Sequence, residues 1–228
     1  MADNPLTRQI IIPAQNEVRT MNKWTDTNHV TKYLNRADRI PHRKEGERVL
    51  LEQLPDTLNR VLDIGTGDGC LLSMTLACHS KAEGVGLDFS PVMLEHARSQ
   101  FAGNKSVQIV DANLDEPLPK LGTFDAIVSS FAIHHCSHER KRTLYEEAYY
   151  LLSPGGVFCN LEHVASPTYH LHERFMKSIG ESVKNEDPTN KLLDVQTQLE
   201  WLRVIGFEHV DCYWKWLELA LLIGYRPR

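Results

Sequence analysis

The sequence predicts a single α/β domain built on a Rossmann-like, doubly wound sheet of seven strands, mostly parallel with the last strand antiparallel. Three observations favour this fold. Short apolar runs alternate with helical stretches through the middle of the chain, which is typical of a parallel sheet with helices on both faces. The first apolar run, residues 60–64, leads into a glycine-rich loop. The last two runs, residues 207–213 and 217–225, are joined by too few residues for a crossover, so they must form a hairpin.

The remaining elements follow from the same patterns. Buried strands are predicted at residues 60–64, 82–87, 107–110, 124–129 and 157–161. Helices are predicted at residues 71–79, 138–152 and 192–205. Another helix opens at Ser90-Pro91, because serine caps a helix and proline suits its first turn.

The N-terminal region has a different character from the rest of the chain. Residues 1–22 are polar and aperiodic, so we expect a flexible arm, followed by one domain over residues 23–228. Helical stretches at 27–35 and 43–54, separated by Ile40-Pro41, predict a helical lid over residues 23–55. Residues 164–192 are a candidate for a second lid or an insertion.

Composition and charge narrow the classes of function. The chain has 228 residues, 42% of them hydrophobic, and a formal net charge of −5, which argues against non-specific nucleic-acid binding but leaves a tRNA held by a local patch open. The five cysteines form no CxxC pair, so we expect reduced thiols and no metal. No apolar run approaches the roughly 20 residues of a membrane span. We therefore expect a cytoplasmic monomer or homodimer that has no membrane partner.

A glycine-rich loop after the first strand is the strongest motif. Asp63 is followed by Gly65, Gly67 and Gly69 at alternate positions, whereas a dinucleotide fingerprint would require a third glycine where Cys70 stands. Glycines let the backbone turn sharply and approach a ligand closely. This D-x-G-x-G-x-G pattern resembles the first motif of the class I S-adenosylmethionine (SAM)-dependent methyltransferases.

Later strand ends strengthen the resemblance. The second strand ends at Asp88-Phe89 and the third at Asp111-Ala112, where the family places contacts to the ribose and adenine of SAM. A solvated strand-end acid and a plain turn are the alternative interpretations of these two positions. The run from Phe124 to His135, and Leu152-Ser153-Pro154-Gly155-Gly156, also resemble family motifs.

The resemblance implies SAM as cofactor, S-adenosylhomocysteine (SAH) as product and a set of cofactor-binding residues. Arg43 belongs to that set if a lid closes over the methionyl carboxylate, and otherwise to a solvated basic pair with Lys44. The expected set is Arg43, Asp63, Gly65, Thr66, Gly67, Asp68, Asp88, Phe89, Met93, Asp111, Ala112, Asn113, Ser129 and Ser130.

Methyl transfer from a sulfonium needs positioning of the acceptor, and a base only where the acceptor must lose a proton. The candidate catalytic residues are His134 and His135 after the fourth strand and Glu162 and His163 after the fifth; capping or packing is the alternative for the histidines. The candidate acceptor-binding residues are Trp24, Tyr33, Trp214 and Trp216. Trp214, Lys215 and Trp216 are expected to form the link after strand six; two core tryptophans at strand period two are the alternative.

Three functions remain open at this point. The first is a methyltransferase acting on a small-molecule acceptor. The second is a tRNA wobble-uridine-type modification enzyme, because Arg39-Ile40-Pro41 and residues 206–211 resemble the carboxy-SAM synthase group. In that synthase an arginine holds the extra carboxylate; Trp201 stands at the matching position and cannot form a bidentate pair, which favours ordinary SAM. The third is a non-catalytic SAM- or dinucleotide-binding protein.

Overall fold

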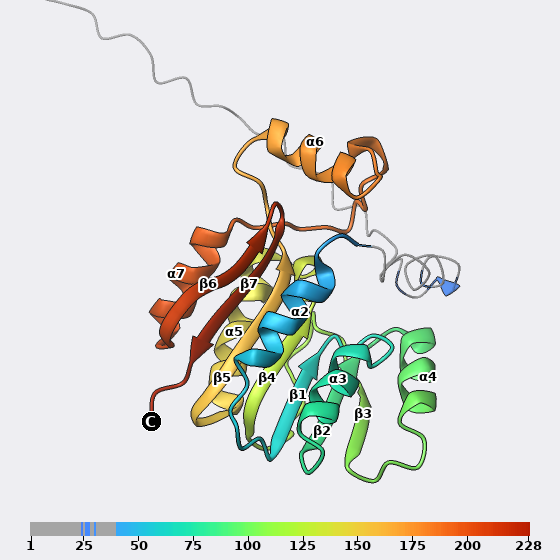
Figure 1. Ribbon diagram of the computed structural model, residues 1–228, viewed down its shortest axis with the longest axis vertical. Coiled ribbons are helices and arrows are strands. Elements are labelled where there is room, and N and C mark those ends of the chain that lie inside the picture. The colour runs from blue at the N-terminus through green and yellow to red at the C-terminus, as the bar shows by residue number, and fades with distance from the viewer. Residues whose placement is uncertain (1–23, 25, 28–29, 31–39) are drawn as a thin grey trace, which may run out of the picture.

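A computed structural model describes residues 24, 26, 27, 30 and 40–228, and these form a seven-stranded sheet in the order β3-β2-β1-β4-β5-β7-β6 (Figure 1). Neighbouring strands from β3 to β5 are parallel, while β7 runs antiparallel to both β5 and β6. The predicted mixed sheet with an antiparallel last strand is therefore confirmed. The strands are β1 (Arg60–Ile64), β2 (Glu83–Asp88), β3 (Val107–Asp111), β4 (Phe124–Ser130), β5 (Leu152–His163), β6 (Glu208–Trp216) and β7 (Leu219–Tyr225).

Helices cover both faces of the sheet, with α2 and α3 on one face and α5 and α7 on the other (Figure 1). The helices are α2 (Arg43–Glu52), α3 (Cys70–Cys78), α4 (Pro91–Gln100), α5 (His138–Leu151), α6 (Tyr169–Ser178) and α7 (Val195–Ile205), with short 3-10 turns η2 (Ile133–His135) and η3 (Val183–Asn185). No helix in these ranges is long and apolar enough to span a bilayer.

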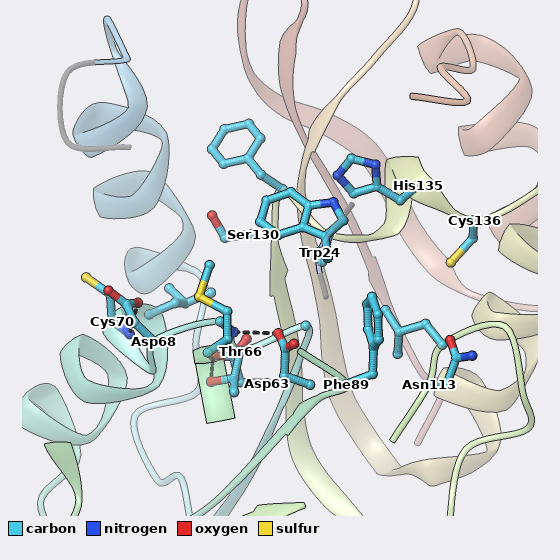
Figure 2. Close-up of a pocket in the computed structure, with 18 of the residues that line it drawn as sticks. Trp24, Asp63, Thr66, Asp68, Cys70, Phe89, Asn113, Ser130, His135 and Cys136 are labelled. Atoms are coloured by element: carbon cyan, nitrogen blue, oxygen red, sulfur yellow. Dashed lines mark hydrogen bonds between the residues drawn. The ribbon is translucent and has the colours of Figure 1, made fainter. Parts of the chain in front are cut away.

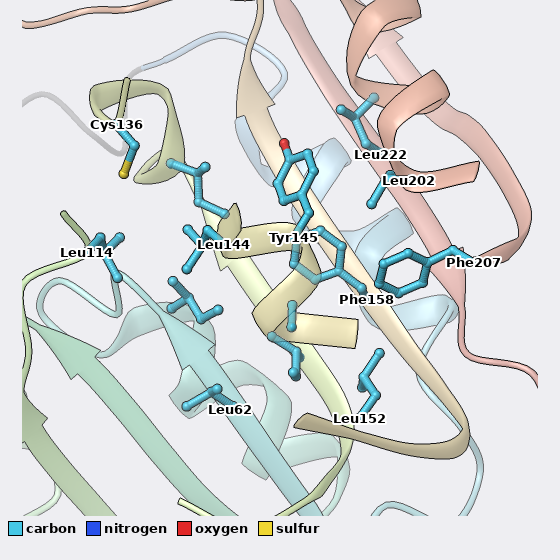
Figure 3. Close-up of a cluster of buried hydrophobic side chains, with 14 of the residues drawn as sticks. Leu62, Leu114, Cys136, Leu144, Tyr145, Leu152, Phe158, Leu202, Phe207 and Leu222 are labelled. Carbon is cyan, nitrogen blue, oxygen red and sulfur yellow. The ribbon is translucent and has the colours of Figure 1, made fainter. Parts of the chain in front are cut away.

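The core lies in two layers, one on each face. On the α5 and α7 side, Tyr145 and Phe158 pack with Leu202, Phe207 and Leu222 (Figure 3). Both faces of the central strands are covered, so buried residues follow one another along them without alternation; six consecutive residues of β7 are buried. Edge strand β6 instead alternates half-buried and exposed residues, as expected of a strand with one solvent-facing side.

Element ends differ from the predicted ones by a few residues, for local reasons. The last helix begins at Val195 because the Asp194 side chain accepts the Thr197 N–H. It ends at Ile205, because Gly206 follows with a φ of 115° that only glycine adopts readily. The predicted link at Trp214–Trp216 is wrong: β6 continues through Trp216, and only Leu217 and Glu218 separate β6 from β7. The side-chain alternation of Trp214, Lys215 and Trp216 is the period of a strand.

Of the predicted N-terminal elements, α2 is described and contacts β5, β6 and β7. The predicted arm, and all of the 27–35 helix except Thr27 and Val30, lie outside the described residues. The region from 164 to 192 contains α6 and η3, and Phe175 and Met176 bury their side chains in the core. Whether these two segments act as lids stays a prediction.

Candidate functional site

A cavity opens at the carboxyl ends of β1, β2 and β4. Its walls come from the loop after β1, the tip of β2, the loops after β3 and β4, and Arg43 of α2 (Figure 2). Open α/β sheets bind ligands at this end, because the loops there diverge around the point where the strand order reverses. The glycine-rich loop thus forms the floor of the cavity.

The glycine-rich loop holds a shape that other residues would disturb. Gly65, Gly67 and Gly69 all have positive φ, at 70°, 58° and 89°. A Cβ on Gly65 would lie 2.1 Å from the Cβ of Ala132, so the loop after β4 packs directly on this glycine. The loop is also fixed by the Thr66 N–H, which donates to the carbonyl of Leu87 at 2.8 Å.

Asp88 is a firmly held carboxylate on the cavity wall. Its Oδ2 accepts the Gly67 N–H at 2.9 Å and its Oδ1 accepts the Ser90 N–H at 2.8 Å. Burial raises the pKa of Asp88, against the opposing effect of those two N–H groups. Each oxygen keeps a further lone pair for a ligand hydroxyl. Phe89 and Met93 supply apolar surface next to it.

Two buried oxygen atoms of residues that line the cavity have no hydrogen-bond partner in the described part of the chain. One is Oδ1 of Asp63, whose Oδ2 accepts the Thr66 hydroxyl at 2.7 Å. Burial raises the pKa of Asp63 to about 7, although the Thr66 hydrogen bond acts in the other direction. The other is the Ser130 hydroxyl. Buried polar groups normally find partners, so the two atoms indicate places where a polar ligand is received.

His135 presents its ring to the cavity beside Trp24 (Figure 2). The two rings meet edge to face, with centroids 5.2 Å apart. The Nδ1 atom of His135 lies 3.1 Å from Oγ1 of Thr189, and its Nε2 is buried without a hydrogen-bond partner among the described residues. Burial, and then the neighbouring His134, lower the pKa of His135 well below the usual value, so the ring is neutral near pH 7.

A second polar cluster lies behind the cavity. The Nδ1 atom of His134 lies 2.8 Å from Oε1 of Glu162, and His163 and His172 each contact the fully buried Glu218 at 3.0 Å. Burial raises the pKa of Glu162 to about 7 and lowers that of His134. None of the five is in the cavity wall. The contact between His134 and Glu162 joins the loop that carries His135 to β5.

The predicted site residues therefore separate into two groups. Those that line the cavity are Trp24, Arg43, Asp63, Gly65, Thr66, Gly67, Asp68, Asp88, Phe89, Met93, Asn113, Ser130 and His135. Those that are described but lie outside its wall are Asp111, Ala112, Ser129, His134, Glu162, His163, Trp214 and Trp216. Tyr33 lies outside the described residues.

The second group has other contacts. Ser129 donates its hydroxyl to the Ile64 carbonyl at 2.8 Å and so joins β4 to β1. Asp111 is exposed at the end of β3. Trp214 lies against Gly46 of α2, and Trp216 stacks on His42 at 4.6 Å.

Several lining residues escaped sequence reasoning. These are Cys70, Leu71, Leu114, Asp115, Phe131, Ala132 and Cys136. All are neighbours of motif residues, but the motifs do not show which side of a loop faces inward. For Arg43 the favoured interpretation was a solvated basic pair with Lys44. Its guanidinium instead lies 5.4 Å above the Phe131 ring and donates to Glu47 at 2.7 Å, so it is not part of a solvated patch. In the described ranges no cluster of three or more His, Cys, Asp or Glu side chains is arranged to hold a metal ion.

Comparison with known proteins gives consistent results. Residues 61–156 match the family model described as "Methyltransferase domain". The chain is 29% identical over 167 residues to the demethylmenaquinone methyltransferase of Clavibacter sepedonicus, covering 67% of this chain and 66% of that one. It is 22% identical over 210 residues to the carboxy-S-adenosyl-L-methionine synthase of Nautilia profundicola, covering 85% and 88%.

A solved structure, the S-adenosylmethionine-dependent methyltransferase SibL in its apo form, superposes with a TM-score of 0.62 at 25% identity, covering 81% of this chain and 55% of SibL. The chain thus spans slightly less than two thirds of the demethylmenaquinone enzyme and about half of SibL.

Proposed function

We propose that this chain is a class I SAM-dependent methyltransferase that transfers the methyl group of SAM to a small-molecule acceptor bound beside His135. The observation that carries the proposal is Asp88, a buried carboxylate at the tip of β2 that Gly67 and Ser90 hold in place. A carboxylate at this position suits the two hydroxyls of a ribose.

The other lining residues fit the rest of SAM. Phe89 and Met93 offer apolar surface for adenine. The unpaired Oδ1 of Asp63 suits the methionyl ammonium, and the Arg43 guanidinium suits the carboxylate. When bound, SAM supplies an activated methyl group whose leaving sulfur is neutral. The protein's own task is then to hold the acceptor in line with that methyl group and to keep water out.

The acceptor is proposed to be a small molecule. The space beside His135 is enclosed by Trp24 and Phe131, which suits a compact, partly apolar compound. One of the relatives is named for a quinone, demethylmenaquinone.

Two observations weigh against the carboxy-SAM and tRNA alternatives. Trp201 packs against the hydrophobic core on α7 and is not in the cavity wall, so no cation is supplied there for an extra carboxylate. The net charge of −5 gives a polynucleotide no general attraction.

The test has a binding step and a turnover step. Calorimetry of the full chain with SAH should show saturable binding, with NAD⁺ as the comparison ligand. Methyl-labelled SAM should then give labelled product with members of a panel of phenols, quinols and amines, and none with bulk tRNA. Binding of NAD⁺ without SAH would refute the cofactor assignment. Labelling of tRNA instead of the panel would replace the small-molecule acceptor by RNA.

A further inference from the structure

The contacts of His135 define which of its nitrogen atoms carries the proton. Nδ1 lies 3.1 Å from the Thr189 hydroxyl oxygen, and that oxygen lies 2.9 Å from Oδ1 of Asp187. Thr189 and Asp187 belong to the segment between α6 and α7, within the range 164–192 that is the candidate for a second lid or an insertion, although neither residue was itself predicted to belong to the site.

Counting donors resolves the direction of both hydrogen bonds. A hydroxyl has one hydrogen, and an ionised carboxylate can only accept. The Thr189 hydrogen must point to Asp187, because otherwise the lone pairs of two oxygens 2.9 Å apart would face each other. Thr189 Oγ1 can then only accept from His135, so Nδ1 carries the proton. The lone pair of Nε2 is then left buried and without a partner among the described residues, on a side chain that lines the cavity.

We propose that Thr189 and Asp187 are positioning residues that hold His135 as its Nδ1–H tautomer, so that Nε2 takes a proton from the methyl acceptor. The inference rests on the proposed function and deepens it. It assigns a chemical class to the acceptor: the attacking atom bears a removable proton, as in a phenol, a quinol or an amine N–H. A tertiary amine or a thioether has no such proton to lose.

The step balances without another reactant. The acceptor atom forms a bond to the methyl carbon while the S–C bond breaks, and the electron pair of that bond stays on sulfur. The acceptor's proton moves to Nε2, which leaves a methylated acceptor, a neutral thioether and an imidazolium. The imidazolium then releases its proton to water. Its burial favours that release, because a buried cation is costly.

Imidazole ¹⁵N NMR of the labelled full chain, free and with SAH, tests the tautomer directly. The His135→Gln spectrum identifies the His135 signals. We expect a protonated Nδ1 and an unprotonated Nε2 in the wild type and in Thr189→Ser, which keeps the hydroxyl. In Thr189→Val the ratio of Nδ1–H to Nε2–H forms should fall about fivefold, the factor that one net hydrogen bond of about 1 kcal/mol supplies. Asp187→Ala should shift the ratio in the same direction, because the hydroxyl is then free to donate to Nδ1.

Thr57→Val is the matched control, because Thr57 is exposed just before β1 at the opposite end of the sheet; it should leave the His135 signals unchanged. A wild-type spectrum with Nε2 protonated would overturn the inference, as would wild-type signals in Thr189→Val. Thr189→Ser and Asp187→Ala provide the test if the valine variant does not fold. The free chain reports the tautomer even where SAH fails to bind, so a failure of the proposed function is distinguishable from a failure of this inference.

Discussion

Asp88 and Asp111 end the neighbouring strands β2 and β3 and pair directly across the sheet. The sequence patterns assign both to the cofactor, yet their surroundings differ. Asp88 turns toward the Gly67 N–H and lines the cavity, whereas Asp111 is exposed and lies outside its wall. A motif predicts that an acid stands at a strand tip. It does not predict where the side chain turns, because that depends on which backbone N–H groups lie within reach.

Substitution of the two acids separates their roles. Asp88→Ala should weaken SAH binding by roughly a hundredfold, since charge-assisted hydrogen bonds are each worth about 1.5–3 kcal/mol. Asp111→Ala should change it by less than about threefold, as is usual for exposed polar side chains. Calorimetry measures both. Glu83→Ala, at the other end of β2, controls for the loss of an acid from the same strand. Equal losses in the two variants would show that Asp111 also contacts the ligand.

The raised pKa of Asp63 leads us to predict that the affinity for SAH depends on pH. Its pKa is raised to about 7 in the free protein, chiefly by burial. A ligand ammonium beside Oδ1 favours the ionised carboxylate, so binding must lower this pKa and release a proton below pH 7. SAH affinity should therefore rise with pH up to about 7, by at most tenfold per unit, and level off above.

Calorimetry between pH 5.5 and 8.5, in buffers of different ionisation enthalpy, measures both the affinity and the released proton. Asp63→Asn, which cannot titrate, should lose most of the dependence. A wild-type affinity that falls as pH rises from 5.5 to 7 would contradict the assigned contact.

At the scale of elements, the loop after β1 and the loop after β4 pack directly on each other at Gly65 and Ala132. Gly65 and Gly103 both have positive φ, at 70° and 81°. An added Cβ would meet the Ala132 Cβ at 2.1 Å at Gly65, but nothing within 4 Å at Gly103. The two substitutions therefore share the backbone strain and differ in the steric clash.

Gly103→Ala should lower the free energy of unfolding by about 1 kcal/mol, the usual strain of a non-glycine residue at positive φ. Gly65→Ala adds overpacking worth roughly 1–3 kcal/mol and should also abolish SAH binding, because the loop must separate from Ala132. Urea unfolding and calorimetry check these values. Similar unfolding midpoints for the two variants would mean that the β4 loop moves aside easily.

The sequence predicts the positions of most strands and helices, but it predicts few of the side-chain contacts between them. The strands from β1 to β5 are predicted because apolar runs and glycine turns are local signals. The end of β6 is mispredicted because Trp214 and Trp216 suit a pocket wall as well as a strand; their packing on Gly46 and His42 of a distant segment decides between the two. Thr189 gives no local signal, since its partner His135 lies 54 residues away.

At the scale of the whole molecule, buried polar groups join segments far apart in the chain. Lys141 of α5 donates to the carbonyls of His134, Cys136 and Lys191, and so holds the η2 loop against the segment before α7. Oε1 of Glu162 on β5 accepts the His163 N–H and lies within hydrogen-bond distance of His134 Nδ1. Its other oxygen is buried without a partner in the described part of the chain. The network makes the stability of the domain depend on the protonation of Glu162.

The sign of that dependence follows from the direction of the shift. The pKa of Glu162 is raised from 4.5 to about 7 by burial, although Lys141 acts to lower it. The unfolded chain therefore releases the proton at lower pH than the folded one. Its contribution to stability is fully present below about pH 4.5 and is lost as pH rises toward 7, so the folded state bears a buried charge above that value.

Relative to Glu162→Gln, which keeps an acceptor oxygen and does not titrate, the wild type should lose about 2–3 kcal/mol of unfolding free energy between pH 5 and pH 8. Urea unfolding at several pH values gives this difference, and contributions from Asp63 cancel because both proteins contain it. Glu95→Gln on the exposed side of α4 should instead track the wild type at every pH. A gap between wild type and Glu162→Gln that stays constant over this range would mean that Glu162 is ionised throughout, with His134 or Lys141 compensating its charge.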